Sequence, residues 1–98
     1  MPLLSQAEID KRIRTMTGWA QAPSSLHKKF TLRTFLAAIE LVNRIASAAE
    51  NANHHPDLTI RYNVVEIALS THSAGGITEK DFALAQQIDE LASNQRGA

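Results

Sequence analysis

Three of the four histidines lie in two short segments whose composition suits proton-transfer chemistry. His54 and His55 are adjacent, and His72 comes later in the chain, shortly before the glycine pair 75–76. A neutral imidazole can accept or donate a proton near pH 7, because the pKa of free imidazole is about 6.5. If the fold brings the two segments together, the three rings form a site for acid–base catalysis.

The first histidine pair should stand at the end of a long helix. Apolar residues repeat at helical spacing from Thr34, a suitable N-cap, to about Asn51. His55 precedes Pro56, and a residue before proline avoids the helical backbone conformation. The helix should therefore end near His55, so that both histidines lie between the helix and the next strand.

The second segment should follow a β-hairpin. Residues 58–62 and 65–71 alternate apolar and polar side chains, which predicts two strands joined by a two-residue turn at 63–64. This turn pairs Leu58 with Leu69, and every apolar side chain then falls on one face. The start of the first strand lies beside the end of the second, so we expect the two histidine segments to meet.

The remaining segments complete a fold of alternating helices and hairpins. A Ser-x-x-Glu capping box starts the first helix, and a Thr-x-x-Asp box starts the last. The predicted elements are a helix from residue 5 ending before Gly18, strands at 19–21 and 26–32, the helix at 34–51, strands at 58–62 and 65–71, and a helix from Thr78. We predict one α+β domain over residues 1–98, with three helices packed on one face of a four-stranded antiparallel sheet.

The helix at 34–52 carries more apolar surface than one sheet face requires. Its first seam comprises Phe35, Ile39, Val42, Ala46 and Ala49, and its second comprises Ala38, Leu41, Ile45, Ala48 and Ala52. We expect the first seam to cover the sheet. The second is small and aliphatic, which predicts packing against the same helix of another copy.

Composition excludes several classes of function. The 10 basic and 10 acidic residues balance, and no basic stripe indicates a nucleic-acid ligand. No apolar run reaches the roughly 20 residues that a membrane span requires. The chain has no cysteine, which excludes disulfides and thiolate chemistry. With no signal-peptide pattern in the first residues, we expect a cytoplasmic protein.

Each of these features also has a purely structural explanation. The helix dipole favours histidines at a helix C-terminus, and the glycine pair 75–76 suits a tight turn as well as the approach of a flat ligand. Three histidines can hold a catalytic zinc, but no H-x-H or H-x₃-H spacing is present, so we predict no metal. Asp81 is first a capping residue, Glu50 can hold an imidazole one turn away, and His27 is expected to be a surface residue.

These residues together resemble the pterin-4a-carbinolamine dehydratase family. The similar stretches are Glu50-x-x-x-His54-His55-Pro56, then Tyr62-x-x-Val65, and then Leu69-Ser70-Thr71-His72-x-x-x-Gly76-Ile77-Thr78-x-x-Asp81. Gly18-Trp19 and the stretch 30–35 resemble the first half of the family. The resemblance covers nearly the whole chain, and the family fold has the helix–strand order predicted above.

The resemblance implies dehydration of 4a-hydroxytetrahydrobiopterin to quinonoid dihydropterin, which recycles the pterin cofactor of aromatic amino acid hydroxylases without a metal or a bound organic cofactor. His55 would be the base or an anchor for the pterin ring. His54 and His72 would be the candidates for protonating the departing hydroxyl. The substrate-binding residues implied by the resemblance are Glu50, Pro56, Thr71, Ser73 and Asp81.

The resemblance also implies partners and an alternative role. Family members assemble through an edge strand and the second helix, so we expect a homodimer or homotetramer using helix 34–52, and a functional link to a hydroxylase. Some relatives of this fold are dimerisation partners or assembly helpers, but helpers without the chemistry tend to lose the histidines. The chain departs from some members at Asn53, Lys80 and Leu58. These changes would affect pterin affinity or preference and leave the acid–base set intact.

Overall fold

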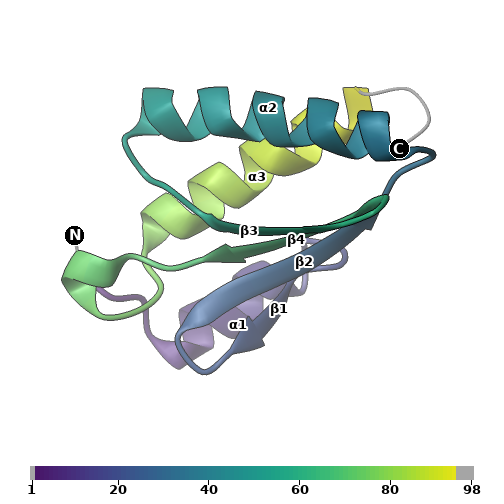
Figure 1. Cartoon of the computed structure of the whole chain (residues 1–98). Coiled ribbons are helices and arrows are strands. Elements are labelled where there is room, and N and C mark those ends of the chain that lie inside the picture. Colours follow the sequence, from purple (N-terminus) through teal and green to yellow (C-terminus); the bar gives the residue numbers. More distant parts are fainter. Residues whose placement is uncertain (1, 95–98) are drawn as a thin grey trace.

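The computed structural model describes residues 2–94, which form the predicted α+β architecture (Figure 1). Its elements, in order, are α1 (Gln6–Ile13), β1 (Ala20–Ala22), β2 (Ser25–Thr31), α2 (Phe35–Ala52), β3 (Asp57–Arg61), β4 (Val64–Leu69), a short 3₁₀ helix η1 (His72–Ala74) and α3 (Glu79–Asn94). The order of the helices and strands and the antiparallel pairing are confirmed. Both strands of the first hairpin lie one residue closer to its turn than predicted, which is within the usual uncertainty of strand ends.

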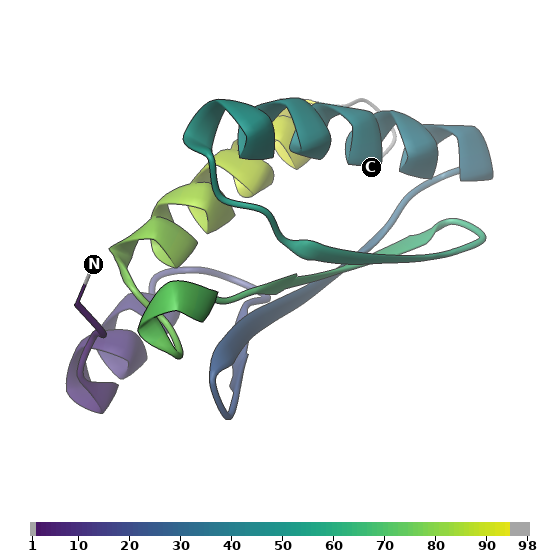
Figure 2. The same ribbon diagram turned by 60° about the vertical axis from the view of Figure 1, so that its left-hand side comes forward.

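The four strands lie in the order β1-β2-β4-β3, with β1 and β3 at the edges. β2 pairs with β4 along its length, from Leu26 opposite Leu69 to Thr31 opposite Val64. The long helices α2 and α3 cover one face of this sheet (Figure 2), and α1 lies beside β1 and the start of α3, where Gln6 contacts Gln21. Buried and exposed side chains alternate along β2, so the opposite face of the sheet is accessible.

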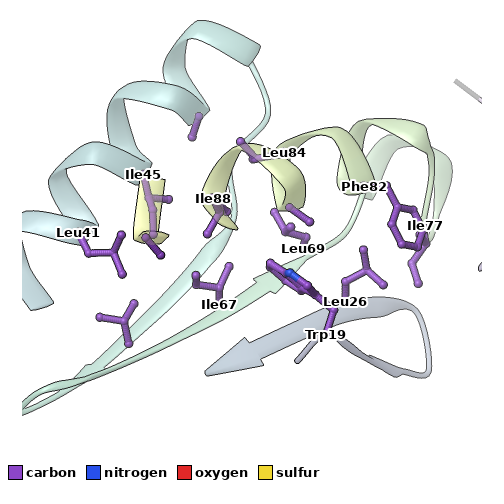
Figure 3. Close-up of a cluster of buried hydrophobic side chains, with 14 of the residues drawn as sticks. Trp19, Leu26, Leu41, Ile45, Ile67, Leu69, Ile77, Phe82, Leu84 and Ile88 are labelled. Carbon is purple, nitrogen blue, oxygen red and sulfur yellow. The ribbon is translucent and has the colours of Figure 1, made fainter. Parts of the chain in front are cut away.

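The core lies between the covered face of the sheet and the two long helices (Figure 3). Its fully buried large side chains come from β2, β4, α2 and α3, namely Leu26, Ile67, Leu69, Leu41, Ile45, Leu84 and Ile88. Trp19 is buried at the edge of this core, and its indole N–H donates to both oxygens of Asp89 on α3 at 3.0 and 3.1 Å. These buried side chains join the sheet to both long helices.

The hairpin turn lies one residue earlier than predicted. Leu58 pairs with Ile67 and not with Leu69, and the two turn residues are Tyr62 and Asn63. Asn63 fixes this position, because its side-chain amide donates to the Leu32 carbonyl at 2.8 Å. The register shifts by two residues, which leaves each side chain on its predicted face, so the apolar pattern did not distinguish the two turns.

The second seam of α2 faces the core, and not the first seam as predicted. The second seam supplies Ala38, Leu41 and Ile45 to the core. From the first seam only Ala49 is buried, whereas Phe35 remains 52% exposed. The two seams have nearly the same composition, and the packing of α3 beside α2 decides which of them faces inward.

Helix α1 is shorter than predicted, because it ends at Ile13 and not just before Gly18. The Thr15 hydroxyl donates to the Arg12 carbonyl at 2.9 Å. Such a bond offers the backbone an alternative to the helical ladder. Gly18 instead takes a left-handed conformation, with φ of 87°, in the turn that leads into β1.

Candidate active site

The adjacent residues His54 and His55, which follow the end of α2, differ in exposure to solvent. Asn53 caps the helix in the left-handed conformation, with φ of 50°, and the His54 N–H donates to the Ala49 carbonyl at 3.0 Å. The helix has ended at this point, and His55 precedes Pro56, which disfavours the helical conformation. His54 is buried at 8% exposure, whereas the side chain of His55 is 59% exposed.

His54 belongs to a buried polar cluster formed by His54, Thr71, Thr78 and Asp81. The His54 Nε2 lies 2.6 Å from one carboxylate oxygen of Asp81. The other oxygen accepts bonds from the Thr71 hydroxyl and the Thr78 backbone N–H, both at 2.9 Å. Asp81 is fully buried, and a buried carboxylate requires such partners. The cluster joins the end of α2, the end of β4 and the start of α3.

His55 is paired with an exposed carboxylate. Its Nε2 contacts the Glu50 side chain, which lies one turn earlier on α2. A partner on one ring nitrogen fixes the orientation of the ring and the role of the other nitrogen. Glu50 therefore holds an imidazole, one of the two roles that its position suggested.

His72 lies on a tightly folded loop that follows β4. The Gly75 N–H donates to the carbonyls of Thr71 and His72 at 3.0 and 3.1 Å, and the Thr71 N–H donates to the Gly76 carbonyl at 2.8 Å. Gly75 has φ of 80°, and a Cβ at this position would meet no atom within 4 Å. The glycine is therefore explained by its backbone conformation, and this conformation holds η1 against the strand end.

The two histidine segments meet at a pocket on the accessible face of the sheet. Its volume is about 360 Å³, within the range of roughly 300–1,000 Å³ that is typical of small-molecule sites. It lies where β2 and β3 begin and β4 ends. Its lining residues are Ser24, Ser25, His27, His55, Asp57, Ala68, Ser70, His72 and Gly75.

The pocket includes some of the predicted site residues and not others. His55 and His72 line it, but His54 lies apart from them in the buried polar cluster. The left-handed conformation of Asn53, which ends α2, precedes this separation of the two neighbouring side chains. Of the predicted substrate-binding residues, Thr71 and Asp81 lie in the buried cluster, Glu50 contacts His55, and Pro56 and Ser73 are chain neighbours of lining residues without lining the pocket.

The predicted site omitted both of the other titratable side chains that line the pocket, His27 and Asp57. His27 was expected to be a surface residue, and Asp57 was not considered. His27 lies opposite Ala68, and Ala68 lies opposite Asp57. The alternation of β2 placed His27 on a polar face, but only the pairing of β2 with β4 brings it to the pocket. Ser25 contacts its ring, with Oγ 2.6 Å from Nε2.

Two further findings concern residues 2–94 only. No three histidine or acidic side chains in this part of the chain are grouped so that they could hold a metal ion. Within the same range, none of the helices combines the length and the apolar character that crossing a membrane requires.

Comparison with known proteins identifies the family. A family model described as pterin 4 alpha carbinolamine dehydratase matches residues 2–91. The chain belongs to the pterin carbinolamine dehydratase family. A relative from Herpetosiphon aurantiacus, named "Putative pterin-4-alpha-carbinolamine dehydratase", is 52% identical over 93% of this chain and 95% of its own. A dehydratase relative from Nostoc punctiforme, with the same name, is 45% identical over 91% of this chain and 96% of its own.

Solved structures share the fold of this dehydratase family member. A transcriptional coactivator/pterin dehydratase from Brucella melitensis superimposes with a TM-score of 0.88 at 29% identity, covering 92% of this chain and 98% of its own. A pterin dehydratase-like protein described as a RuBisCO assembly factor in the alpha-carboxysome superimposes with a TM-score of 0.63 at 24% identity, over 76% and 86% of the two chains. The second likeness concerns the fold alone.

Proposed function

We propose that the protein dehydrates 4a-hydroxytetrahydrobiopterin to quinonoid dihydropterin and water by histidine acid–base catalysis. In this role it recycles the pterin cofactor of aromatic amino acid hydroxylases in the cytoplasm. The observation that carries the proposal is the meeting of His55 and His72 at one pocket in a chain of this family. The cysteine-free composition agrees with a reducing compartment.

The reaction requires two proton movements. The bond between ring carbon 4a and the hydroxyl oxygen breaks, the hydroxyl takes up a proton and leaves as water, and the neighbouring ring nitrogen loses a proton as a carbon–nitrogen double bond forms. One imidazole accepts the nitrogen proton and another donates to the hydroxyl. Each positioned acid or base typically contributes about 10²–10⁴-fold to the rate.

The geometry supports a division of roles among the three histidines. His55 is the base, because the Glu50 carboxylate holds one of its ring nitrogens and leaves the other as the polar atom for substrate. His72, across the pocket on η1, donates to the departing hydroxyl. His54 positions both of them through the buried polar cluster, which joins the two loops that carry them. Pro56 and Ser73 remain candidates for contacts at the pocket rim.

The test follows the decay of freshly prepared 4a-hydroxytetrahydrobiopterin with and without the protein. Wild type should accelerate the decay, and His55→Ala and His72→Ala should not. Lys29→Ala is the matched control, because Lys29 is exposed on the same sheet face but lies outside the pocket. No acceleration by wild type would overturn the proposal, and zinc that is stoichiometric and required for turnover would replace it with a metal mechanism.

We further propose that the protein is a homodimer or homotetramer through α2 and an edge strand. The outer side of α2 exposes Phe35 and Leu36, at 52% and 67%. Within residues 2–94, no strand pairs with the outer side of β3, and backbone groups at such an edge can pair with another strand. Sedimentation should therefore show an oligomer that Phe35→Glu dissociates. A folded wild-type monomer at micromolar concentration would contradict this proposal.

The alternative is a non-catalytic dimerisation or assembly role of the same fold. The exposed apolar residues of α2 favour it, because such a surface can bind a partner protein. The two roles differ in their dependence on the histidines. An assembly role would survive the His55→Ala and His72→Ala changes, whereas dehydration would not.

A further inference from the structure

A row of three side chains crosses the accessible face of the sheet at the pocket. His27 on β2 is paired with Ala68 on β4, and Ala68 is paired with Asp57 on β3. Paired residues present their side chains on the same face, and all three line the pocket. Because neighbouring strands are about 4.8 Å apart, His27 and Asp57 flank the small Ala68 at a backbone separation of about 10 Å.

This row lies deeper along the sheet than the proposed acid–base pair. Asp57 is the first residue of β3 and follows His55 by two residues, which corresponds to at most about 7 Å along the chain. His72 lies beyond the other strand end, in η1. The methyl group of Ala68 leaves room above it, so a ligand whose ring lies near the two loop histidines can extend a substituent between His27 and Asp57.

We propose, on the basis of the dehydratase function above, that His27 and Asp57 bind the hydroxyl-bearing substituent of the pterin. The Asp57 carboxylate accepts hydrogen bonds from hydroxyls. The Nε2 atom of His27 lies 2.6 Å from the Ser25 Oγ. The other ring nitrogen, Nδ1, can form a hydrogen bond with a substrate hydroxyl. The dihydroxypropyl group of biopterin has two adjacent hydroxyls, which suit two polar groups on either side of a small residue.

The charge of the pocket sharpens this specificity. Among the residues that the structure describes, its lining includes one carboxylate, that of Asp57, and neither lysine nor arginine. Phosphate groups are normally bound by basic side chains or helix N-termini. The row should therefore favour a neutral hydroxylated substituent over a methyl group, and should disfavour a phosphorylated one.

The experiment compares two substrates that differ only at this substituent. His27→Ala should raise KM for the 4a-hydroxy derivative of tetrahydrobiopterin about fivefold, the effect of one lost hydrogen bond. For the derivative of 6-methyltetrahydropterin, KM should change less than about twofold, with kcat within about twofold for both. Asp57→Ala should likewise raise KM for the tetrahydrobiopterin derivative and not for the 6-methyl derivative. His27→Gln, which keeps a hydrogen-bonding group, should recover most of the loss caused by His27→Ala.

Controls separate this inference from the proposed function. Lys29→Ala, on the same strand and face but outside the pocket, should change neither KM. A similar rise in KM for both substrates, or no change for either, would overturn the inference while leaving the dehydratase function standing. Calorimetry can measure the same preference without turnover, by comparing the affinities for dihydrobiopterin and 6-methyldihydropterin. Equal affinities of the wild-type protein for the two compounds would also overturn the inference.

Discussion

The two adjacent histidines at the end of α2 have opposite surroundings, although each contacts a carboxylate. His54 is buried against Asp81, which has further partners in Thr71 and Thr78. His55 is exposed against Glu50, on the surface of α2. Exposed ion pairs contribute little to stability, whereas removal of one partner from a buried pair is strongly destabilising. The buried pair therefore holds the loops together, and the exposed pair is available for chemistry.

The largest expected effect separates activity from stability on the exposed side. His55→Ala and His72→Ala should each lower the dehydration rate by at least about 100-fold, because each removes a proton donor or acceptor. The free energy of unfolding should change by less than about 0.5 kcal/mol, as is usual for exposed positions. Stopped-flow kinetics and urea titration measure the two quantities. A large loss of stability in either variant would contradict the view that the exposed histidines serve chemistry and not stability.

The converse effect is expected on the buried side. His54→Ala leaves the Asp81 carboxylate buried without its ring partner, which should lower the free energy of unfolding by about 3 kcal/mol. Urea denaturation checks this value. The folded fraction should keep substantial activity, and a stable His54→Ala protein with no activity would instead place His54 among the catalytic groups.

The pH dependence of the rate tests whether imidazole is the base. The imidazole that accepts a proton must be neutral and the one that donates must be protonated, so the rate should pass through a maximum and fall toward low pH by up to roughly tenfold per pH unit. Initial rates between pH 5 and 8, corrected for the uncatalysed decay, measure the profile. A flat profile over this range would contradict the role proposed for His55.

The smallest effect concerns the second partner of Asp81. Thr71→Val keeps the shape of the side chain but removes the hydroxyl that donates to Asp81 and contacts Thr78 at 2.8 Å. The expected loss in the free energy of unfolding is about 1–2 kcal/mol. The double variant with His54→Ala should lose less than the sum of the two single variants, because both contacts serve the same carboxylate.

Local patterns were sufficient to predict the elements and the meeting of His55 with His72. Capping residues and alternation are short-range signals: the Ser5 hydroxyl accepts from the Glu8 N–H at 3.2 Å, and the Asp81 carboxylate accepts from the Thr78 N–H at 2.9 Å. The hairpin brings its two outer ends together in either register. An error of one residue in the turn therefore did not affect the prediction that the histidine segments lie side by side.

The rest of the site depended on long-range information. The direction of His54 follows from the left-handed conformation of Asn53 and from Asp81, which lies 27 residues away in the chain. The position of His27 follows from the pairing of β2 with β4, and two predicted hairpins do not specify which strands of different hairpins are neighbours. The inner seam of α2 likewise depends on where α3 packs. In each case the deciding contact is distant in sequence.

The accessible face of the sheet has a consequence for how the family can diversify. The pocket floor at His27, Ala68 and Asp57 lies on the opposite side of the strands from the tightly packed interior. Side chains on this floor can be exchanged without leaving voids among Leu26, Ile67 and their neighbours. Ligand preference in this scaffold is therefore free to drift while the thermal tolerance of the protein stays the same.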